Sequence, residues 1–219
     1  MPILNTNDSK LYFRLYSLVW LFLILLITGF VIAGVQPEDY LLSESGPIET
    51  ISAIGYLLCA AAIIRLAGDW SGRWPAAGLL ILFALREMDF HNRFTTMSLS
   101  KSRFYLSPEV GMTEKLIGGA VIAMFLYCIY RLFRLEGRAW LNGLKRGKAC
   151  AYGVLFALSC IVIAKSLDGF ARKLADVGIL VSSQAASYAS IFEEVLELGI
   201  PIMIGLSIAC YYRHGRNRA

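Results

Sequence analysis

Apolar runs of roughly 20 residues recur along the whole amino-acid sequence, and no other feature constrains the fold as strongly. A run of this length crosses about 30 Å of hydrocarbon when it forms an α-helix. The chain is 57 % hydrophobic, whereas soluble domains are about 45–50 % apolar. The segments between the runs are too short to hold a separate soluble domain. The sequence therefore predicts an all-α, polytopic membrane protein.

These runs predict a bundle of six transmembrane helices with short loops, within one integral membrane domain that covers residues 1–219. Pro47 and Pro75 lie near the starts of two runs, where a missing backbone N–H has little effect. The first run is too long for the apolar region of a signal peptide, so we interpret it as a retained span. The predicted spans are Leu15–Val35, Ile48–Ala67, Trp74–Phe90, Leu116–Phe133, Ala149–Leu167 and Ala189–Tyr212.

The distribution of Lys and Arg predicts the orientation of these spans. The segment Arg131–Lys148 holds six basic residues and one acid, and the tail Arg213–Arg218 adds three more basic residues. Six spans put both segments on the side of the N-terminus, which the positive-inside rule makes cytoplasmic. We therefore expect both termini on the cytoplasmic side of a bacterial inner membrane. The basic pI of about 9.0 then reflects cytoplasmic loops and does not require a nucleic-acid partner.

Ionisable side chains from five of the six predicted spans fall at the outer side of the membrane. Charges at membrane depth are costly, so they face the bundle interior or water and pair with one another. This convergence predicts a polar site near the outer leaflet. Its candidate residues are Glu49, Arg86, Glu87, Asp89, His91, Lys115, Lys165, Asp168, Glu193, Glu194 and Glu197.

The stretch ALREMDFHNRF, residues 84–94, ends the third predicted span with a dense cluster of charge. Glu87 and His91 are four residues apart and would share a helix face, a spacing that suits one metal ion or an acid–base pair. Arg86 and Asp89 would lie on a neighbouring face, which suits ion pairing or an anionic group such as phosphate. The end of a helix is also an ordinary place for mixed charge, and that interpretation stays open.

The sixth predicted span places Glu193, Glu194 and Glu197 within about 100° of helical arc. Pro201 follows on the same face and cannot donate to the carbonyl of Glu197, so we expect a kink there. Three carboxylates in a dry place cannot all be ionised unless cations compensate them. The candidates for compensation are Arg86, Lys115, Lys165 and a bound divalent metal ion. Alternatively, Glu193 and Glu194 lie in water and only Glu197 is buried.

Simple structural explanations exist for several of these residues. Glu49 would lie in the first turn of its helix, where an acid gains about 0.3–1 kcal/mol from the helix dipole. Lys165 and Asp168 are three residues apart and would pair with each other. The five cysteines form no CxxC pair, so neither a disulfide framework nor a thiolate metal site is expected. The sequence also lacks HxxxH, GxSG, Walker and Rossmann glycine patterns.

Three functions remain open from the sequence. The first is an enzyme at the outer leaflet, a metal-assisted hydrolase or group transferase that acts on a lipid-like or phosphate-bearing substrate. The second is a membrane assembly or sensor subunit whose buried ion network only fixes helix packing. The third is a proton- or ion-coupled transporter, with the carboxylates of the sixth span as its coupling site.

For the enzyme, each candidate residue has an expected role. The expected catalytic residues are Glu87, His91, Asp168 and Glu197. The expected ligands of a divalent metal ion are Glu87, His91, Asp168, Glu194 and Glu197. The residues expected to bind an anionic head group are Arg86, Lys115 and Lys165. The expected partners are the lipid bilayer and such a head group, and no protein partner is indicated.

Overall fold

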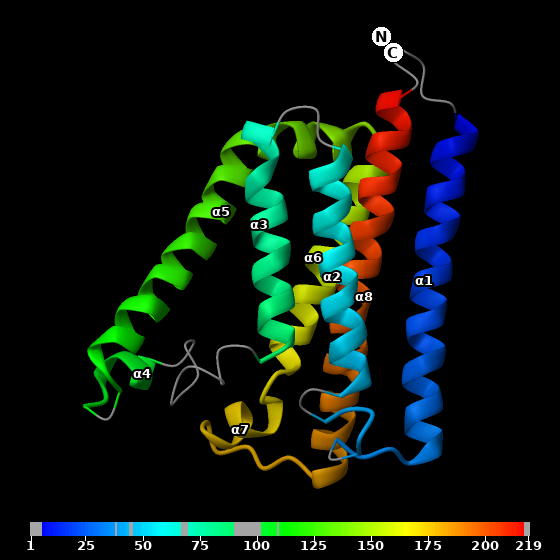
Figure 1. The fold of residues 1–219 in the computed structure, drawn as a ribbon. Helices are drawn as coiled ribbons and strands as arrows, with labels where there is room; N and C mark the ends of the chain where they lie inside the picture. The colour runs from blue at the N-terminus through cyan, green and yellow to red at the C-terminus, as the bar shows by residue number, and fades with distance from the viewer. Residues whose placement is uncertain are drawn as a thin grey trace.

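The computed structural model describes residues 6–37, 39–43, 46–66, 70–89, 102–108 and 110–216. All regular secondary structure in these ranges is α-helical. Six long helices form the bundle in Figure 1: α1 (Thr6–Ala33), α2 (Pro47–Leu66), α3 (Trp70–Glu87), α5 (Met112–Lys145), α6 (Ala149–Leu167) and α8 (Ser183–Arg216). Two short helices are α4 (Ser102–Leu106) and α7 (Phe170–Ala175).

The long helices alternate in direction along the chain, so the start of α1 and the end of α8 lie at the same end of the bundle (Figure 1). Arg213 Nη2 of α8 lies 3.6 Å from Asp8 Oδ1 of α1 at this end. We call it the terminal end, and we call the opposite end, where α3 and α6 finish, the distal end. Helices α2 and α8 run in the same direction, whereas α3 runs against both.

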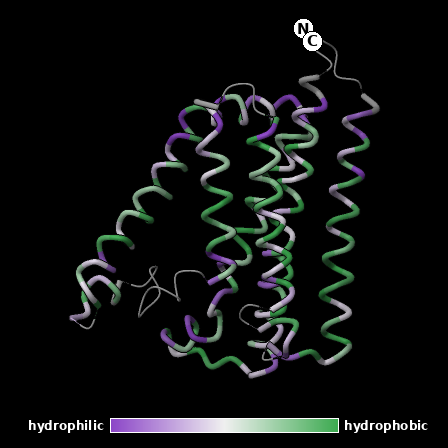
Figure 2. The backbone as a smooth tube through the Cα atoms, viewed as in Figure 1, coloured by the Kyte–Doolittle hydropathy of each residue, from purple (hydrophilic) through white to green (hydrophobic). Residues whose placement is uncertain are grey.

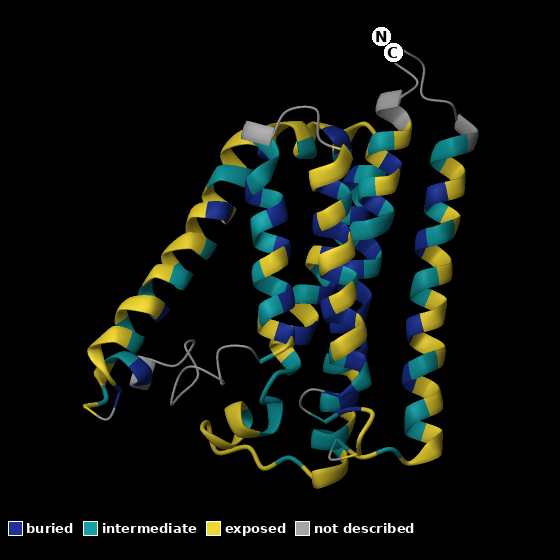
Figure 3. Cartoon of the chain, in the orientation of Figure 1, coloured by how far each residue is buried: buried dark blue, intermediate teal, exposed yellow. Residues whose placement is uncertain are grey.

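Five of the helices are long and apolar enough to cross a membrane, namely α1, α2, α5, α6 and α8. Helix α3 runs beside them, but its 18 residues include Arg73, Arg86 and Glu87. Large apolar side chains such as Leu25, Leu58 and Phe133 are exposed on the outside of the bundle, as lipid-facing residues are. Figure 3 shows exposed residues along much of α1 and α5. The prediction of a helical membrane protein is confirmed at this level.

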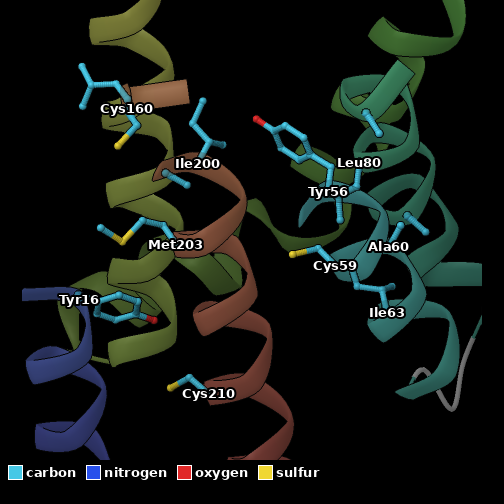
Figure 4. Packing of buried hydrophobic residues seen from close by; sticks show 14 of the residues in the cluster. Tyr16, Tyr56, Cys59, Ala60, Ile63, Leu80, Cys160, Ile200, Met203 and Cys210 are labelled. Carbon is cyan, nitrogen blue, oxygen red and sulfur yellow. The ribbon is translucent and has the colours of Figure 1, made fainter. Parts of the chain in front are cut away.

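Helix α8 is the central helix, because it packs against α1, α2 and α6. The buried cluster around it includes Tyr16 of α1, Cys59 of α2, Cys160 of α6 and Met203 of α8 (Figure 4). Close approach depends on small residues, as is usual between membrane helices. A Cβ atom added to Gly55 of α2 would lie only 2.9 Å from the Cβ of Pro201.

The helix ends differ from the predicted span ends where polar residues continue the helix. Helix α5 runs on to Lys145, so most of the segment predicted as a linker is helical. Helix α8 begins at Ser183, where the Ser182 hydroxyl accepts a hydrogen bond from the Ala185 N–H at 3.3 Å and caps the helix. It is one helix through Pro201. Helix α6 has the predicted bounds.

Helix α3 ends at Glu87, earlier than the predicted span end at Phe90. The backbone leaves the helix at Asp89, whose φ of 46° is in the left-handed region. Hydrophilic residues mark this distal end of α3 and also α7 in Figure 2. The charged segment of α3 is therefore the last turn of a helix followed directly by a turn.

Candidate functional site

Arg86, in the last turn of α3, joins Glu87 and Glu197, the two most buried carboxylates among the described residues. Its Nη1 lies 3.2 Å from Glu87 Oε1, and its Nη2 donates to Glu197 Oε1 of α8 at 2.9 Å. Glu87 and Glu197 are 5 % and 7 % exposed, whereas the Arg86 side chain is 42 % exposed. Buried carboxylates need a partner of opposite charge, and the planar guanidinium provides donors for both.

Lys165, near the distal end of α6, connects Glu197 to a third helix. Its Nζ lies 2.9 Å from Asp168 Oδ2 and 3.8 Å from Glu197 Oε1. The Lys165 ammonium donates to the Asp168 carboxylate and holds the pKa of Asp168 below its usual range, although partial burial opposes this shift. Gly169, with a φ of 60°, then turns the chain into α7, and Lys173 Nζ donates to the Lys165 carbonyl at 3.1 Å. We call Arg86, Glu87, Lys165, Asp168 and Glu197 the ion network.

Three further predicted acids surround the ion network. Glu49, in the first turn of α2, interacts electrostatically with Glu87 and Glu194. Glu193 interacts with Asp168 and Glu197. Glu193 and Glu194 are both half-buried, between full exposure to water and full enclosure. The structure thus brings together eight predicted residues. Seven lie in α2, α3, α6 and α8, and the eighth, Asp168, directly follows α6. They are Glu49, Arg86, Glu87, Lys165, Asp168, Glu193, Glu194 and Glu197.

Three predicted residues remain, and within the described ranges no ion pair joins Lys115 or Asp89 to this group. Lys115 lies in the first turn of α5, and that end of α5 diverges from α8 in Figure 1. Asp89 is half-buried on the turn after α3. His91 lies outside the described residues, so its pairing with Glu87 stays a prediction. Within the described ranges, no three His, Cys, Asp or Glu side chains are arranged to hold a metal ion.

Two uncharged polar residues of α2 were missed by the sequence interpretation. Tyr56 is 1 % exposed, points from α2 toward α8 in Figure 4, and interacts with Glu87, Glu197 and Arg86. Ser52 is fully buried, and its Oγ has no hydrogen-bond partner among the described residues. Because Glu49, Ser52 and Tyr56 are spaced i, i+3 and i+7, they share one face of α2. That spacing is the signal in the sequence that would have found them.

The half of the bundle toward the terminal end is apolar by contrast. The described core cluster there is made of aliphatic, cysteine and tyrosine side chains, including Tyr16, Ile63, Met203 and Cys210 (Figure 4). The charged groups of the described core are therefore concentrated toward the distal end.

The fold and the ion network define a class, a helical membrane protein with a carboxylate-rich polar centre in one half of its bundle. No protein-family model, curated protein or solved structure matches the chain. Function must therefore be inferred from the chemistry of the site itself.

Proposed function

We propose that this chain is an enzyme of the outer leaflet, a hydrolase or group transferase that acts on a lipid-like or phosphate-bearing substrate. In this proposal α3 is a sixth span, and both termini lie on the cytoplasmic side of a bacterial inner membrane. The distal end, with the ion network, then faces outward. The basic residues of Arg131–Lys148 support this orientation, because they lie toward the terminal end of α5 and just beyond it.

One observation carries the proposal: a single, partly exposed arginine spans two buried carboxylates with unequal surroundings. Glu197 faces both Arg86 and Lys165, whereas Glu87 has an ion pair with Arg86 alone among the described residues. Two carboxyl groups in unequal surroundings can serve as base and acid in one reaction. We assign Glu197 as the base, because it contacts two cations, and Glu87 as the acid.

The exposed cations of the ion network support a substrate with an anionic head group. The side chains of Arg86 and Lys165 are 42 % and 45 % exposed, so each can donate to a phosphate while it still contacts Glu197. A guanidinium suits phosphate because it donates two parallel hydrogen bonds. Asp168 holds Lys165 in place from the other side. The substrate would enter from the surrounding leaflet.

A metal-dependent form of the reaction stays within this proposal. This form takes Glu87, Asp168, Glu194 and Glu197, with His91, as the ligands of a divalent cation, since hard cations prefer carboxylate oxygens. It requires the described acids to move closer together on binding, because no three of them are arranged to hold a metal ion. The test is turnover after chelation with EDTA and again after addition of Mg²⁺ or Mn²⁺. Turnover that is lost and then restored supports the metal-dependent form, whereas unchanged turnover contradicts it.

The enzyme proposal is tested with the full chain reconstituted in vesicles of phosphatidylglycerol and phosphatidylethanolamine. Mass spectrometry of the lipids should reveal a released or transferred head group. Glu197→Gln should lower the rate by a factor of about 100 or more, since the general base is lost. Ser207→Ala on the same helix is the control, because Ser207 lies toward the terminal end. Its hydroxyl donates a hydrogen bond to the Cys150 carbonyl oxygen at 2.7 Å. Folded wild-type protein that leaves these lipids intact contradicts the proposal.

A structural role is the second candidate, and the pairing within the ion network favours it. Each of its five members has an ionic partner within 4 Å, and such networks can specify how helices pack. In that case Glu197→Gln should lower thermal stability, and any loss of activity should follow loss of folded protein. Transport is supported less, because the described apolar core offers no polar route toward the terminal end.

A further inference from the structure

Ser52 is an unusual buried hydroxyl in this bundle. Ser17, Ser159 and Ser166 each donate to the carbonyl four residues back, at 3.0, 2.9 and 2.7 Å, which is common for serine in a helix. Ser52 is 0 % exposed, yet its Oγ has no partner among the described residues. A buried polar atom without a partner is destabilising, and ordered water commonly satisfies such atoms.

The packing of α2 against α3 places Ser52 level with Glu87. The Tyr56 and Phe83 rings stack with centroids 5.4 Å apart. The two helices run in opposite directions, so one turn toward the distal end leads from Tyr56 to Ser52 and from Phe83 to Glu87. This register places Ser52 and Glu87 at the same level of the two helices.

The packing of α2 against α8 places Ser52 level with Glu197 as well. Gly55 lies against Pro201, and the Cys59 thiol is 3.4 Å from the Pro201 carbonyl oxygen. These helices run in the same direction, so one turn toward the distal end leads from Gly55 to Ser52 and from Pro201 to Glu197. The two registers together place Ser52 at the level where Arg86 joins Glu87 to Glu197.

We propose that the Ser52 hydroxyl holds a water molecule against Glu87 and Glu197, and that this water is the nucleophile of the hydrolysis. A buried water needs two to four polar partners, and one hydroxyl with two carboxyl groups supplies three. The role of the water rests on the proposed function. The existence of the water site rests only on Ser52 and its neighbours.

In the reaction, the water oxygen forms a bond to the phosphorus or carbonyl carbon of the substrate, and the water proton passes to the Glu197 carboxylate. The bond to the leaving oxygen breaks, and that oxygen takes a proton from Glu87, which enters the reaction as a neutral carboxyl whose Oε1 accepts from Arg86. Ser52 accepts or donates one hydrogen bond and exchanges no proton with the substrate. It is a positioning residue, which fixes the direction of attack.

The water site is tested first by thermal unfolding of the full chain in detergent, with two matched controls. The hydroxyl of Ser207 is bonded, so Ser207→Ala should lower Tm. The Tyr16 hydroxyl is also buried without a partner, but it packs directly against Gly153, so Tyr16→Phe should leave Tm unchanged or raise it. If Ser52 holds water, Ser52→Ala should lower Tm as Ser207→Ala does. An unchanged or raised Tm, as for Tyr16→Phe, would overturn the water site.

A structure that resolves ordered water supplies the direct test. Density about 3 Å from Ser52 Oγ and from a carboxylate oxygen of Glu87 or Glu197 is expected, and a dry, filled space there overturns the inference.

In vesicles with added methanol, Ser52→Ala should change the ratio of methanol transfer to hydrolysis by about tenfold, whereas Ser52→Thr and Ser207→Ala should not. An unchanged ratio refutes the role in attack. If the wild type releases no head group, the proposed function fails, while the density and Tm still decide the water site.

Discussion

The two halves of the bundle are built by the same helices but held together in different ways. Toward the terminal end, α8 packs on α1, α2 and α6 through side chains such as Tyr16, Met203 and Cys210. Toward the distal end, α8 meets α3 and α6 through Glu197 and its two cations. Packing between membrane helices depends on shape, whereas a buried charge depends on one particular partner. A function based on charge is therefore expected in the distal half.

The buried hydroxyls sharpen this comparison. Tyr16 and Ser52 are both buried without a hydrogen-bond partner among the described residues. Tyr16 lies in the apolar cluster against Gly153, whereas Ser52 lies one turn from Tyr56, which interacts with the charges of Arg86, Glu87 and Glu197. The same kind of unsatisfied atom is thus a packing compromise in one half and a site for water in the other.

The largest expected effect comes from removing the cation that two carboxylates share. Arg86→Ala leaves Glu87 without its ion pair and weakens that of Glu197, so it should lower the free energy of unfolding by about 3–5 kcal/mol. Denaturant titration in detergent micelles measures this loss. Arg73 of α3 is the matched arginine near the terminal end. Its Cζ lies 5.3 Å from the Tyr211 ring centroid and 5.2 Å from the Tyr212 ring centroid. Arg73→Ala should cost about 0.5–2 kcal/mol, and equal losses would contradict the contrast between the halves.

A cavity in the apolar half should affect stability and leave chemistry intact. Met203 is 0 % exposed in the core cluster, so Met203→Ala should cost about 2–5 kcal/mol through lost packing contacts. The rate per folded molecule in the vesicle assay should stay at the wild-type level, in contrast to Glu197→Gln. A rate that falls with Met203→Ala at equal folded protein would show that the two halves are coupled.

The convergence of charge was the part of the site that the sequence could predict. Glu49, Arg86, Lys165 and Glu197 each stand near the end of an apolar run or within one, and burial of charge requires that they pair. That cost predicts that charges of different spans pair, but it does not say which residues pair.

Other features could not be predicted, because they depend on how helices tilt and where they stop. Lys115 has the same sequence context as the others, but the distal end of α5 diverges from the bundle. Helix α1 extends past its apolar run at the N-terminal end, and α5 and α8 extend past theirs at both ends, since hydropathy marks the lipid boundary and not the last hydrogen-bonded turn. The spacing of Ser52 and Tyr56 from Glu49 puts them on one face of α2, but only the register of α2 against its neighbours shows what that face meets.

A tight helix crossing in the bundle should tolerate little added volume. Gly55→Ala would bring a Cβ to 2.9 Å from the Pro201 Cβ, so α2 and α8 must separate at a cost of about 1–3 kcal/mol. Because this crossing sets the register between Ser52 and Glu197, the ratio of methanol transfer to hydrolysis should change as well. Gly119→Ala on α5 is the control, since nothing lies within 4 Å of its added Cβ. A normal Tm for Gly55→Ala would refute the tight crossing.

The smallest effect is expected at the exposed edge of the ion network. The Lys165 and Asp168 side chains are 45 % and 47 % exposed, and solvent-exposed ion pairs contribute about 0–1 kcal/mol. Asp168→Asn should therefore lower Tm only slightly at neutral pH. Because the pKa of Asp168 is lower in the folded state, its contribution is complete above the unfolded pKa of about 3.9 and is lost as the pH falls through the folded pKa. Thermal unfolding is measured from neutral to acidic pH, and the Tm values of the wild type and Asp168→Asn should become equal only in acid. A difference in Tm that persists in acid would mean that the carboxamide acts through geometry rather than through lost charge.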